Sequence, residues 1–183
     1  INTGLGLSGG NLERDLMTSI KLSKENNIDT KVFNSFLNVS KINKRWVLNI
    51  FNQESKKLNI NSKISILGLT YKENTNSIKN SPSIDLIKKI TFKNISCYDP
   101  SAELEGISIN FKRHDDLSLA IKDANILILM SNWKEFKKIT KKMIIRLMKG
   151  KIIIDPLGIL SHLELENLGF KYFVKGKKNL NEF

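Results

Sequence analysis

The sequence has a single cysteine, Cys97, and only two histidines among its 183 residues. One cysteine excludes an intramolecular disulfide and any zinc cluster built from cysteines. His114 and His162 stand far apart without acidic or cysteine neighbours at ligand spacing, so we expect no metal site and no catalytic triad. No apolar run approaches the roughly 20 residues that a membrane-spanning helix needs. No secretory hydrophobic segment precedes the glycine-rich residues 4–10, so we expect a cytoplasmic protein without a membrane partner.

Acidic residues are also scarce. The sequence has 18 acidic and 30 basic residues, which gives a net charge of +12. Such an excess is compatible with nucleic-acid binding. Lysine pairs are spread along the chain instead of forming one tract: Lys56-Lys57, Lys88-Lys89, Lys137-Lys138 and Lys141-Lys142. No helix-turn-helix, zinc-finger or RNA-binding aromatic motif accompanies them. We therefore expect no nucleic-acid partner, only attraction to small molecules that carry phosphate.

The first 60 residues are typical of helices. Apolar residues recur at helical spacing on both sides of a break at residues 26–29. The second pattern, at 31–58, runs for about seven turns, which is longer than a typical globular helix. Its large apolar residues lie on more than one face, so this helix needs a partner. The partner is either the domain that follows or a second copy of the chain.

From residue 63 onward, strands and helices alternate. We expect buried strands at 63–68, 95–100, 124–130, 151–155 and 170–174. The intervening helices are predicted at 81–87, 116–122, 134–148 and 161–167. The clearest helix start is Ser81 as N-cap, followed by Pro82 at the first helical position. This alternation predicts an α/β fold with right-handed crossovers in a doubly wound parallel sheet.

A glycine-rich segment opens the chain. Four glycines between residues 4 and 10 allow the backbone to approach a ligand closely. Asn11 and Asp15 follow one helical turn apart. From the residues alone, Asn11 either caps the helix that begins at Leu12 or forms a hydrogen bond with a hydroxyl or carbonyl of a ligand. Asp15 either favours the helix dipole or takes part in catalysis.

Four stretches of the sequence carry a family resemblance. The run GLGLSGGNLERD at residues 4–15 resembles the active-site loop of the UDP-glucose/GDP-mannose dehydrogenase family, typically GPGFGGSCFPKD. The other stretches are similar to family motifs in the same order: GLTYKENT at 68–75 followed by Ser81-Pro82, YDP at 98–100, and SNWKEF at 131–136. Each motif is weak alone, but together they cover nearly the whole chain.

The resemblance implies an organisation in two parts. Residues 1–60 match the central helical domain, in which the long helix 31–58 forms a homodimer. Residues 61–183 match the C-terminal, Rossmann-like domain that binds the nucleotide sugar. The sequence starts at Ile1, inside the active-site loop, so we expect a fragment that lacks the N-terminal domain with most of the NAD site. The residues that bind NAD are unknown, and we expect the fragment alone to be inactive because no Gly-x-Gly-x-x-Gly follows a strand.

The resemblance also assigns site residues. In the family, the loop cysteine attacks an aldehyde intermediate, and the Asp four residues on helps to deliver water to the thioester. Here Asn11 occupies the cysteine position and Asp15 is retained. An amide is not a nucleophile, so we predict that the second, thioester-based oxidation is absent. The alternative is a homologue that binds a nucleotide sugar without catalysis.

Five residues are predicted to bind the substrate: Gly6, Gly9, Gly10, Tyr71 and Lys72. The loop 69–80 is long for a connection between strand and helix, as functional loops often are. In the family, the lysine that matches Lys72 contacts UDP, whereas the residues alone also fit a solvated loop lysine.

Three positions depart from the family pattern. Leu157 replaces an arginine, Asn132 replaces a glutamate, and Lys79-Asn80 stands where Arg-Glu is usual. Arginine binds phosphate or carboxylate with two parallel hydrogen bonds, which leucine cannot do. We therefore expect a different nucleotide sugar or weaker binding. Cys97 lies within a predicted strand, so we expect an inert core thiol.

Overall fold

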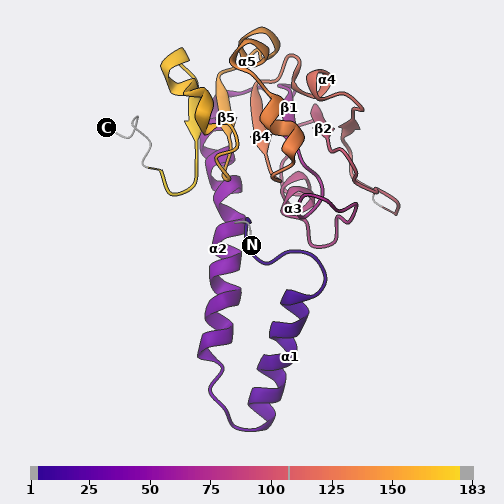
Figure 1. The fold of residues 1–183 in the computed structure, drawn as a ribbon, viewed down its shortest axis with the longest axis vertical. Helices are drawn as coiled ribbons and strands as arrows, with labels where there is room; N and C mark the ends of the chain where they lie inside the picture. The colour runs from indigo at the N-terminus through magenta and orange to yellow at the C-terminus, as the bar shows by residue number, and fades with distance from the viewer. Residues whose placement is uncertain (1–3, 107, 178–183) are drawn as a thin grey trace.

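Two antiparallel helices project from an α/β unit in the computed structural model, which describes residues 4–106 and 108–177 (Figure 1). Helix α1 spans Leu12–Glu25 and α2 spans Lys31–Glu54, followed by the 3-10 turn η1 at Ser55–Lys57. The predicted break between the helices is confirmed: Asn26 caps α1 and Asn27 has a φ of 57°. The long helix thus ends at Glu54, and its continuation to 57 tightens into a 3-10 turn.

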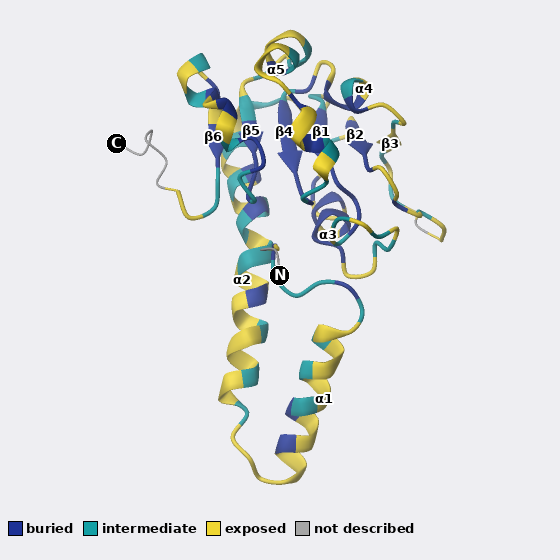
Figure 2. Ribbon diagram, in the orientation of Figure 1, coloured by how far each residue is buried: buried dark blue, intermediate teal, exposed yellow. Residues whose placement is uncertain are grey.

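The two halves of α2 have different surroundings. Val47 and Phe51, in the second half, are 1% and 2% exposed against the sheet. Val32 and Phe36, in the first half, are 64% and 55% exposed. Figure 2 shows that most of the projecting helical hairpin is exposed, whereas the central strands β1, β2 and β4 are buried. The following domain therefore covers only the second half of the helix.

A six-stranded parallel sheet forms the centre of the α/β unit, with strand order β3-β2-β1-β4-β5-β6. The strands are β1 at Ile64–Leu67, β2 at Ile95–Tyr98, β3 at Lys112–Arg113, β4 at Ile126–Leu129, β5 at Ile152–Ile154 and β6 at Lys171–Phe173. All residues of β1, β2 and β4 are buried, as expected for strands covered on both faces. The order and direction confirm the predicted doubly wound, Rossmann-like α/β fold.

Helices cover both faces of the sheet. The short helical elements are α3 at Pro82–Ile87, α4 at Leu117–Ile121, η2 at Lys134–Lys138, α5 at Lys141–Leu147, η3 at Ser161–Leu163 and η4 at Leu165–Leu168. One core joins α2 and α3 to the sheet, and the other joins α4, α5 and the 3-10 turns to the opposite face. Cys97 is buried in the first core, where desolvation raises the pKa of its thiol and disfavours the reactive thiolate.

Three details differ from the expected pattern. Strand β3 was not predicted, because its two residues are exposed and carry no apolar signal. The helix expected at 134–148 is two elements: Ile139 is extended and buried, and Thr140 caps α5 by accepting a hydrogen bond from the Met143 N–H at 3.2 Å. The helix expected at 161–167 is also interrupted, at Glu164 with a φ of 46°.

The predicted start of α3 is confirmed. Ser81 accepts a hydrogen bond from the Ser83 N–H at 3.2 Å, and Pro82 stands at the first position of α3. Within residues 4–106 and 108–177, no helix is both long enough and apolar enough to cross a bilayer. Near the end of the described residues, Lys175 donates a hydrogen bond to Asn43 on α2.

Candidate nucleotide-sugar site

A cleft of about 540 Å³ lies at the carboxyl ends of the strands. Its walls are residues 4–8 of the glycine-rich segment, 71–74 after β1, 130–132 after β4, and Leu157 after β5. Strands β1 and β4 are adjacent in the sheet but are followed by connections that run in opposite directions. Open α/β sheets bind ligands at this topological switch point. We call this the switch-point cleft.

The glycine-rich segment is attached to α2 through Gly6. This residue has a φ of +114°, and an added Cβ would lie 2.8 Å from the Ser40 carbonyl oxygen. The next residue, Leu7, donates its N–H to the Ser40 hydroxyl at 2.8 Å. Only glycine permits both this backbone conformation and this approach. Sequence reasoning did not identify Ser40, because its partner is 33 or more residues away.

Gly9 and Gly10 attach the same segment to the loop 69–80. An added Cβ on Gly9 would lie 2.9 Å from the Tyr71 ring, and one on Gly10 would lie 3.3 Å from Lys79. The Gly9 N–H donates to the Lys79 carbonyl at 3.1 Å, and the Asn80 amide donates to the Gly9 carbonyl at 2.8 Å. The Lys79-Asn80 pair, which departs from the family pattern, therefore holds the glycine-rich segment in place.

Asp99 fixes the beginning of the loop 69–80. Its Oδ2 accepts hydrogen bonds from the Leu69 N–H at 2.6 Å, the Thr70 N–H at 2.9 Å and the Thr70 hydroxyl at 3.0 Å. Its Oδ1 accepts from the N–H groups of Ser101 and Ala102 at 2.9 and 2.8 Å. Asp99 is 3% exposed. It was not among the predicted site residues, although a carboxylate directly after a buried strand was a usable signal.

The motif around Trp133, which follows β4, also holds the loop 69–80. The Trp133 indole N–H donates to the Thr70 hydroxyl at 3.2 Å. The Tyr98 hydroxyl donates to Glu135 at 2.7 Å, and burial together with this carboxylate raises the pKa of Tyr98. Three of the family motifs thus meet in one hydrogen-bonded unit next to the cleft.

Tyr71 and Lys72 both line the switch-point cleft. Tyr71 is half-buried beneath Gly9, and the Lys72 ammonium lies 5.6 Å from the centre of the Tyr71 ring. Ser131 also lines the cleft, and its buried hydroxyl has no hydrogen-bond partner among the described residues. A bound polar molecule would supply a partner for this oxygen.

Asn11 and Asp15 lie at the start of α1, beside the cleft and not among its lining residues. Asn11 is exposed at the N-cap position, but its side chain makes no capping hydrogen bond; its carbonyl accepts the Asp15 N–H at 2.9 Å. Asp15 is exposed and paired with Arg14, whose Nη2 is 3.0 Å from Oδ1. Asn11 therefore occupies the predicted N-cap position without the side-chain hydrogen bond of a cap, and Leu12 is the residue of α1 that reaches the cleft.

Comparison with known proteins places this architecture in a family. The family model for the UDP-binding domain of UDP-glucose/GDP-mannose dehydrogenases matches residues 65–162. The chain belongs to the UDP-glucose/GDP-mannose dehydrogenase family. The predicted resemblance is thereby confirmed.

Individual relatives of this dehydrogenase-family chain extend the match to its helical part. It is 30% identical over 189 residues to the UDP-glucose 6-dehydrogenase of Rickettsia bellii, covering 97% of this chain and 42% of that protein. It is 34% identical over 137 residues to the UDP-N-acetyl-D-mannosamine dehydrogenase of Methanococcus vannielii, covering 72% of this chain and 31% of the other. The chain thus spans well under half the length of these relatives.

Solved structures agree on the fold. The UDP-D-ManNAc dehydrogenase of Pyrococcus horikoshii superposes with a TM-score of 0.78 at 24% identity, over 97% of this chain and 40% of the other. The UDP-N-acetyl-mannosamine dehydrogenase of Staphylococcus aureus superposes with a TM-score of 0.66 at 26% identity, over 94% and 39%.

The segment after the first strand of this dehydrogenase-family domain lacks the glycine pattern of a dinucleotide-binding site. A single glycine, Gly68, follows β1, and an added Cβ would overlap the Ser131 hydroxyl at 2.1 Å. Gly68 therefore allows β1 and β4 to approach, and the further glycines of a dinucleotide fingerprint are missing. No group of three metal-ligating side chains occurs in the part of the chain that the structure describes. The resemblance implies NAD, but these residues offer it no recognisable site.

Proposed function

We propose that this chain forms the nucleotide-sugar-binding part of an NAD-dependent nucleotide-sugar dehydrogenase. The proposal rests on the switch-point cleft, in which the glycine-rich segment lies against the loop 69–80. The division at residue 60, into a helical dimerisation domain at 1–60 and a nucleotide-sugar-binding domain at 61–183, is part of the proposal. So is a cytoplasmic location, where nucleotide sugars are available as substrates.

Lys72 supplies charge to the diphosphate in this proposal. Its side chain is exposed at the wall of the switch-point cleft, and the aromatic ring of Tyr71 lies beside it. Charge-assisted hydrogen bonds to phosphate are roughly twice as strong as neutral ones. The Ser131 hydroxyl, buried without a partner among residues 4–106 and 108–177, would pair with a polar group of the ligand.

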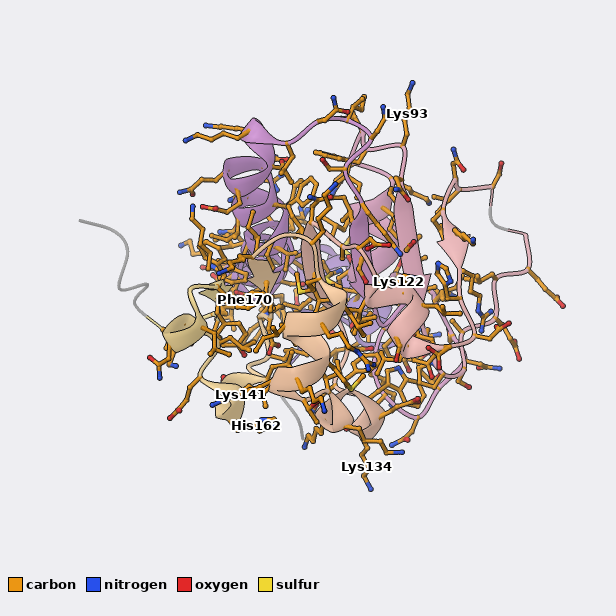
Figure 3. The ribbon with its side chains drawn as sticks, turned by 90° about the horizontal axis from the view of Figure 1, so that it is seen from above. Lys93, Lys122, Lys134, Lys141, His162 and Phe170 are labelled. Atoms are coloured by element: carbon orange, nitrogen blue, oxygen red, sulfur yellow. The ribbon has the colours of Figure 1, made fainter. Side chains whose placement is uncertain are left out.

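Removal of the Lys72 charge tests the binding site. We expect Lys72→Met to weaken UDP binding about 10- to 100-fold, the equivalent of one charged hydrogen bond. Isothermal titration calorimetry with UDP on the chain itself measures this. Lys93→Met is the matched control, because Lys93 points into solvent away from the rest of the molecule (Figure 3). If both variants lost the same UDP affinity, the effect would come from the overall charge and not from a contact between Lys72 and UDP.

Asn11 sets the proposed number of oxidations. Its amide cannot attack an aldehyde, so the acyl-enzyme step has no nucleophile at this position. We expect a protein that joins this chain to a cofactor domain to form one NADH per sugar consumed. Asn11→Cys should raise the ratio toward two, provided that Asp15 is released from Arg14 to position water. A ratio of two in the unaltered protein would contradict this assignment.

A non-catalytic binding protein is the second candidate, and Leu157 favours it. Leu157 lines the cleft at the position of a family arginine and packs against both cores. UDP-sugar binding without any NADH formation, across UDP-, GDP- and TDP-sugars, would select this candidate.

A further inference from the structure

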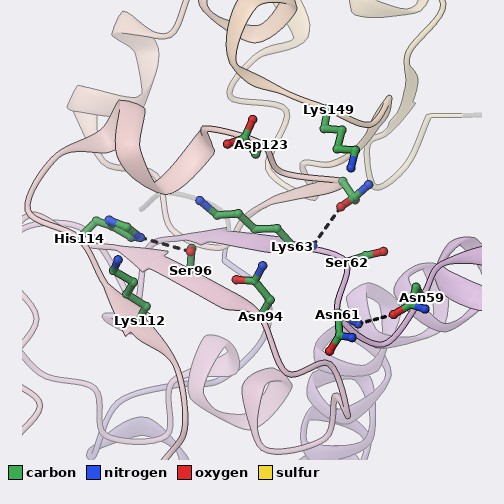
Figure 4. A pocket seen from close by; sticks show the side chains of 11 residues that line it. Asn59, Asn61, Ser62, Lys63, Asn94, Ser96, Lys112, His114, Asp123 and Lys149 are labelled. Atoms are coloured by element: carbon green, nitrogen blue, oxygen red, sulfur yellow. Dashed lines mark hydrogen bonds between the residues drawn. The ribbon is translucent and has the colours of Figure 1, made fainter.

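A second polar pocket opens at the opposite edge of the sheet from the switch-point cleft. Its volume is about 520 Å³. Lys63 immediately precedes β1 and Asn94 immediately precedes β2, so the pocket lies at the amino ends of the strands (Figure 4). We call it the amino-edge pocket. No family motif falls in it, and its residues play no part in the proposed substrate site.

Cations dominate the amino-edge pocket. Lys63, Lys112 and Lys149 enter it from three separate segments, and Asp123 is the only carboxylate among its lining residues (Figure 4). With His114 neutral, three positive charges and one negative charge leave the pocket at +2. Asparagine amides and serine hydroxyls make up the rest of its lining, and these groups also donate hydrogen bonds.

Lys63 is held in place by the backbone. Its ammonium donates hydrogen bonds to the carbonyls of Leu119 at 3.1 Å and Lys122 at 2.7 Å, at the end of α4. Burial lowers the pKa of Lys63; nearby Asp123 opposes this, and Lys112 and Lys122 add to it. A cation that is partly desolvated and repelled by its neighbours is stabilised by an added anion.

His114 forms the other wall. Its Nε2 lies 3.2 Å from the Ser96 hydroxyl, which is buried. Beside Ser96 in the sheet lies Ser65, on the same face, and its buried hydroxyl has no partner in the described part of the chain. Burial, Lys63 and Lys112 lower the pKa of His114, against the opposing charges of Asp115 and Asp116. His114 is therefore neutral near pH 7 while the pocket is empty of anions.

We propose that the amino-edge pocket binds a small, multiply charged anion of the phosphate class. The ammonium groups of Lys63, Lys112 and Lys149 neutralise its charge, and the imidazole of His114 contributes a further N–H when protonated. An anion in the pocket offsets the repulsion among these cations, so binding and protonation of His114 favour each other. At a constant charge of the anion, binding therefore tightens as the pH falls.

Proton NMR with inorganic pyrophosphate tests the proposal on the unaltered chain. The sequence has two histidines, and His162 is exposed on η3, on a different part of the surface (Figure 3). We expect a saturable shift of the His114 ring protons, a rise of about half a unit or more in its pKa, and no change at His162. No saturable shift, or an equal shift at both histidines, would overturn the proposal.

Two exposed lysines provide variants that should fold normally. Lys112→Gln and Lys149→Gln are each expected to lower the affinity for pyrophosphate about three- to tenfold at low ionic strength. Lys93→Gln, which removes the same charge outside the pocket, should leave it within about twofold of the unaltered chain. If all three variants bind equally weakly, pyrophosphate associates only with the overall positive charge, and the proposal is wrong.

Discussion

At the scale of single residues, Asp99 shows how one side chain shapes a site without lining it. Its two oxygens accept five hydrogen bonds, three of them from Leu69 and Thr70 at the start of the loop 69–80. Buried acceptors of this kind impose one loop conformation because the loss of any partner leaves a desolvated group. Asp99 therefore acts as a positioning residue for Tyr71 and Lys72, which follow directly.

Leu157 is the residue at which the family pattern can be restored. We expect Leu157→Arg to strengthen UDP binding about tenfold, because a guanidinium in the cleft forms paired hydrogen bonds with a phosphate. Calorimetry with UDP measures the change. Ile145→Arg adds the same charge on α5, where Ile145 is 57% exposed, and should have little effect. Equal gains in both variants, or weaker binding by Leu157→Arg, would contradict the predicted phosphate contact.

His114 predicts a pH dependence of stability. Its pKa is lowered in the folded state, chiefly by burial, so the unfolded chain binds the proton more readily. The contribution of His114 is present above the unfolded pKa of about 6.5 and is lost as the pH falls from there through the lower pKa of the folded state. Urea unfolding between pH 5 and 7.5 should show a smaller loss on acidification in His114→Gln than in the unaltered chain. Identical slopes in His114→Gln and the unaltered chain would refute the assignment.

At the scale of elements, α2 serves two structural roles along its length. Its second half buries Val47 and Phe51 against the sheet, and its middle receives the glycine-rich segment at Ser40. The segment is therefore clamped between a helix on one side and the loop 69–80 on the other. Because both contacts involve backbone at glycine positions, small side chains added there displace the whole segment.

Gly6 tests this clamp. We expect Gly6→Ala to destabilise the segment by about 2–4 kcal/mol, since it combines a left-handed φ with a Cβ 2.8 Å from the Ser40 carbonyl oxygen. Hydrogen exchange of the Leu7 N–H and thermal unfolding report the loss. Gly176→Ala, at a φ of +82° with nothing near the added Cβ, carries only the backbone penalty of about 1 kcal/mol. Equal effects of the two would show that the contact with Ser40 adds nothing.

At the scale of the whole molecule, the helical hairpin leaves a large apolar surface uncovered. Four residues along one side of α2 are more than half exposed: Val32, Phe36, Val39 and Ile42. On α1, Leu12, Met17 and Leu22 are exposed to a similar extent. Exposed apolar patches of this kind mark interaction surfaces. A second copy of the chain is the proposed partner, as the family resemblance implies for this helix.

Phe36 is the residue with which to test the homodimer. We expect the unaltered chain to be a dimer, and Phe36→Asp to convert it to a monomer, because a carboxylate within an apolar interface is not solvated. Size-exclusion chromatography with light scattering gives the mass of each. Ile145→Asp, on α5 away from the hairpin, should remain a dimer. A monomeric unaltered chain would rule the dimer out.

Much of the fold could be predicted because its signals are local. Short apolar runs such as 64–67 and 126–129 form buried strands through their own composition, and Ser81-Pro82 begins a helix through its own chemistry. Strand β3 has no such signal: Lys112 and Arg113 are exposed and pair with β2 only because the chain passes its edge. The interruption at Ile139 arises where burial of that side chain prevails over helix propensity.

The sequence by itself determined the α/β alternation, the helical pair and the family motifs, since apolar spacing and turn residues act between neighbours along the chain. Only the tertiary structure decided which motifs meet: Gly6 with Ser40, Gly9 with Tyr71, and Asp99 with Leu69 and Thr70. It also decided that Lys63, Lys112, Lys149 and His114 share one pocket. These contacts join residues far apart in the chain, and their formation depends on the cooperative packing of a parallel sheet with both of its helical layers.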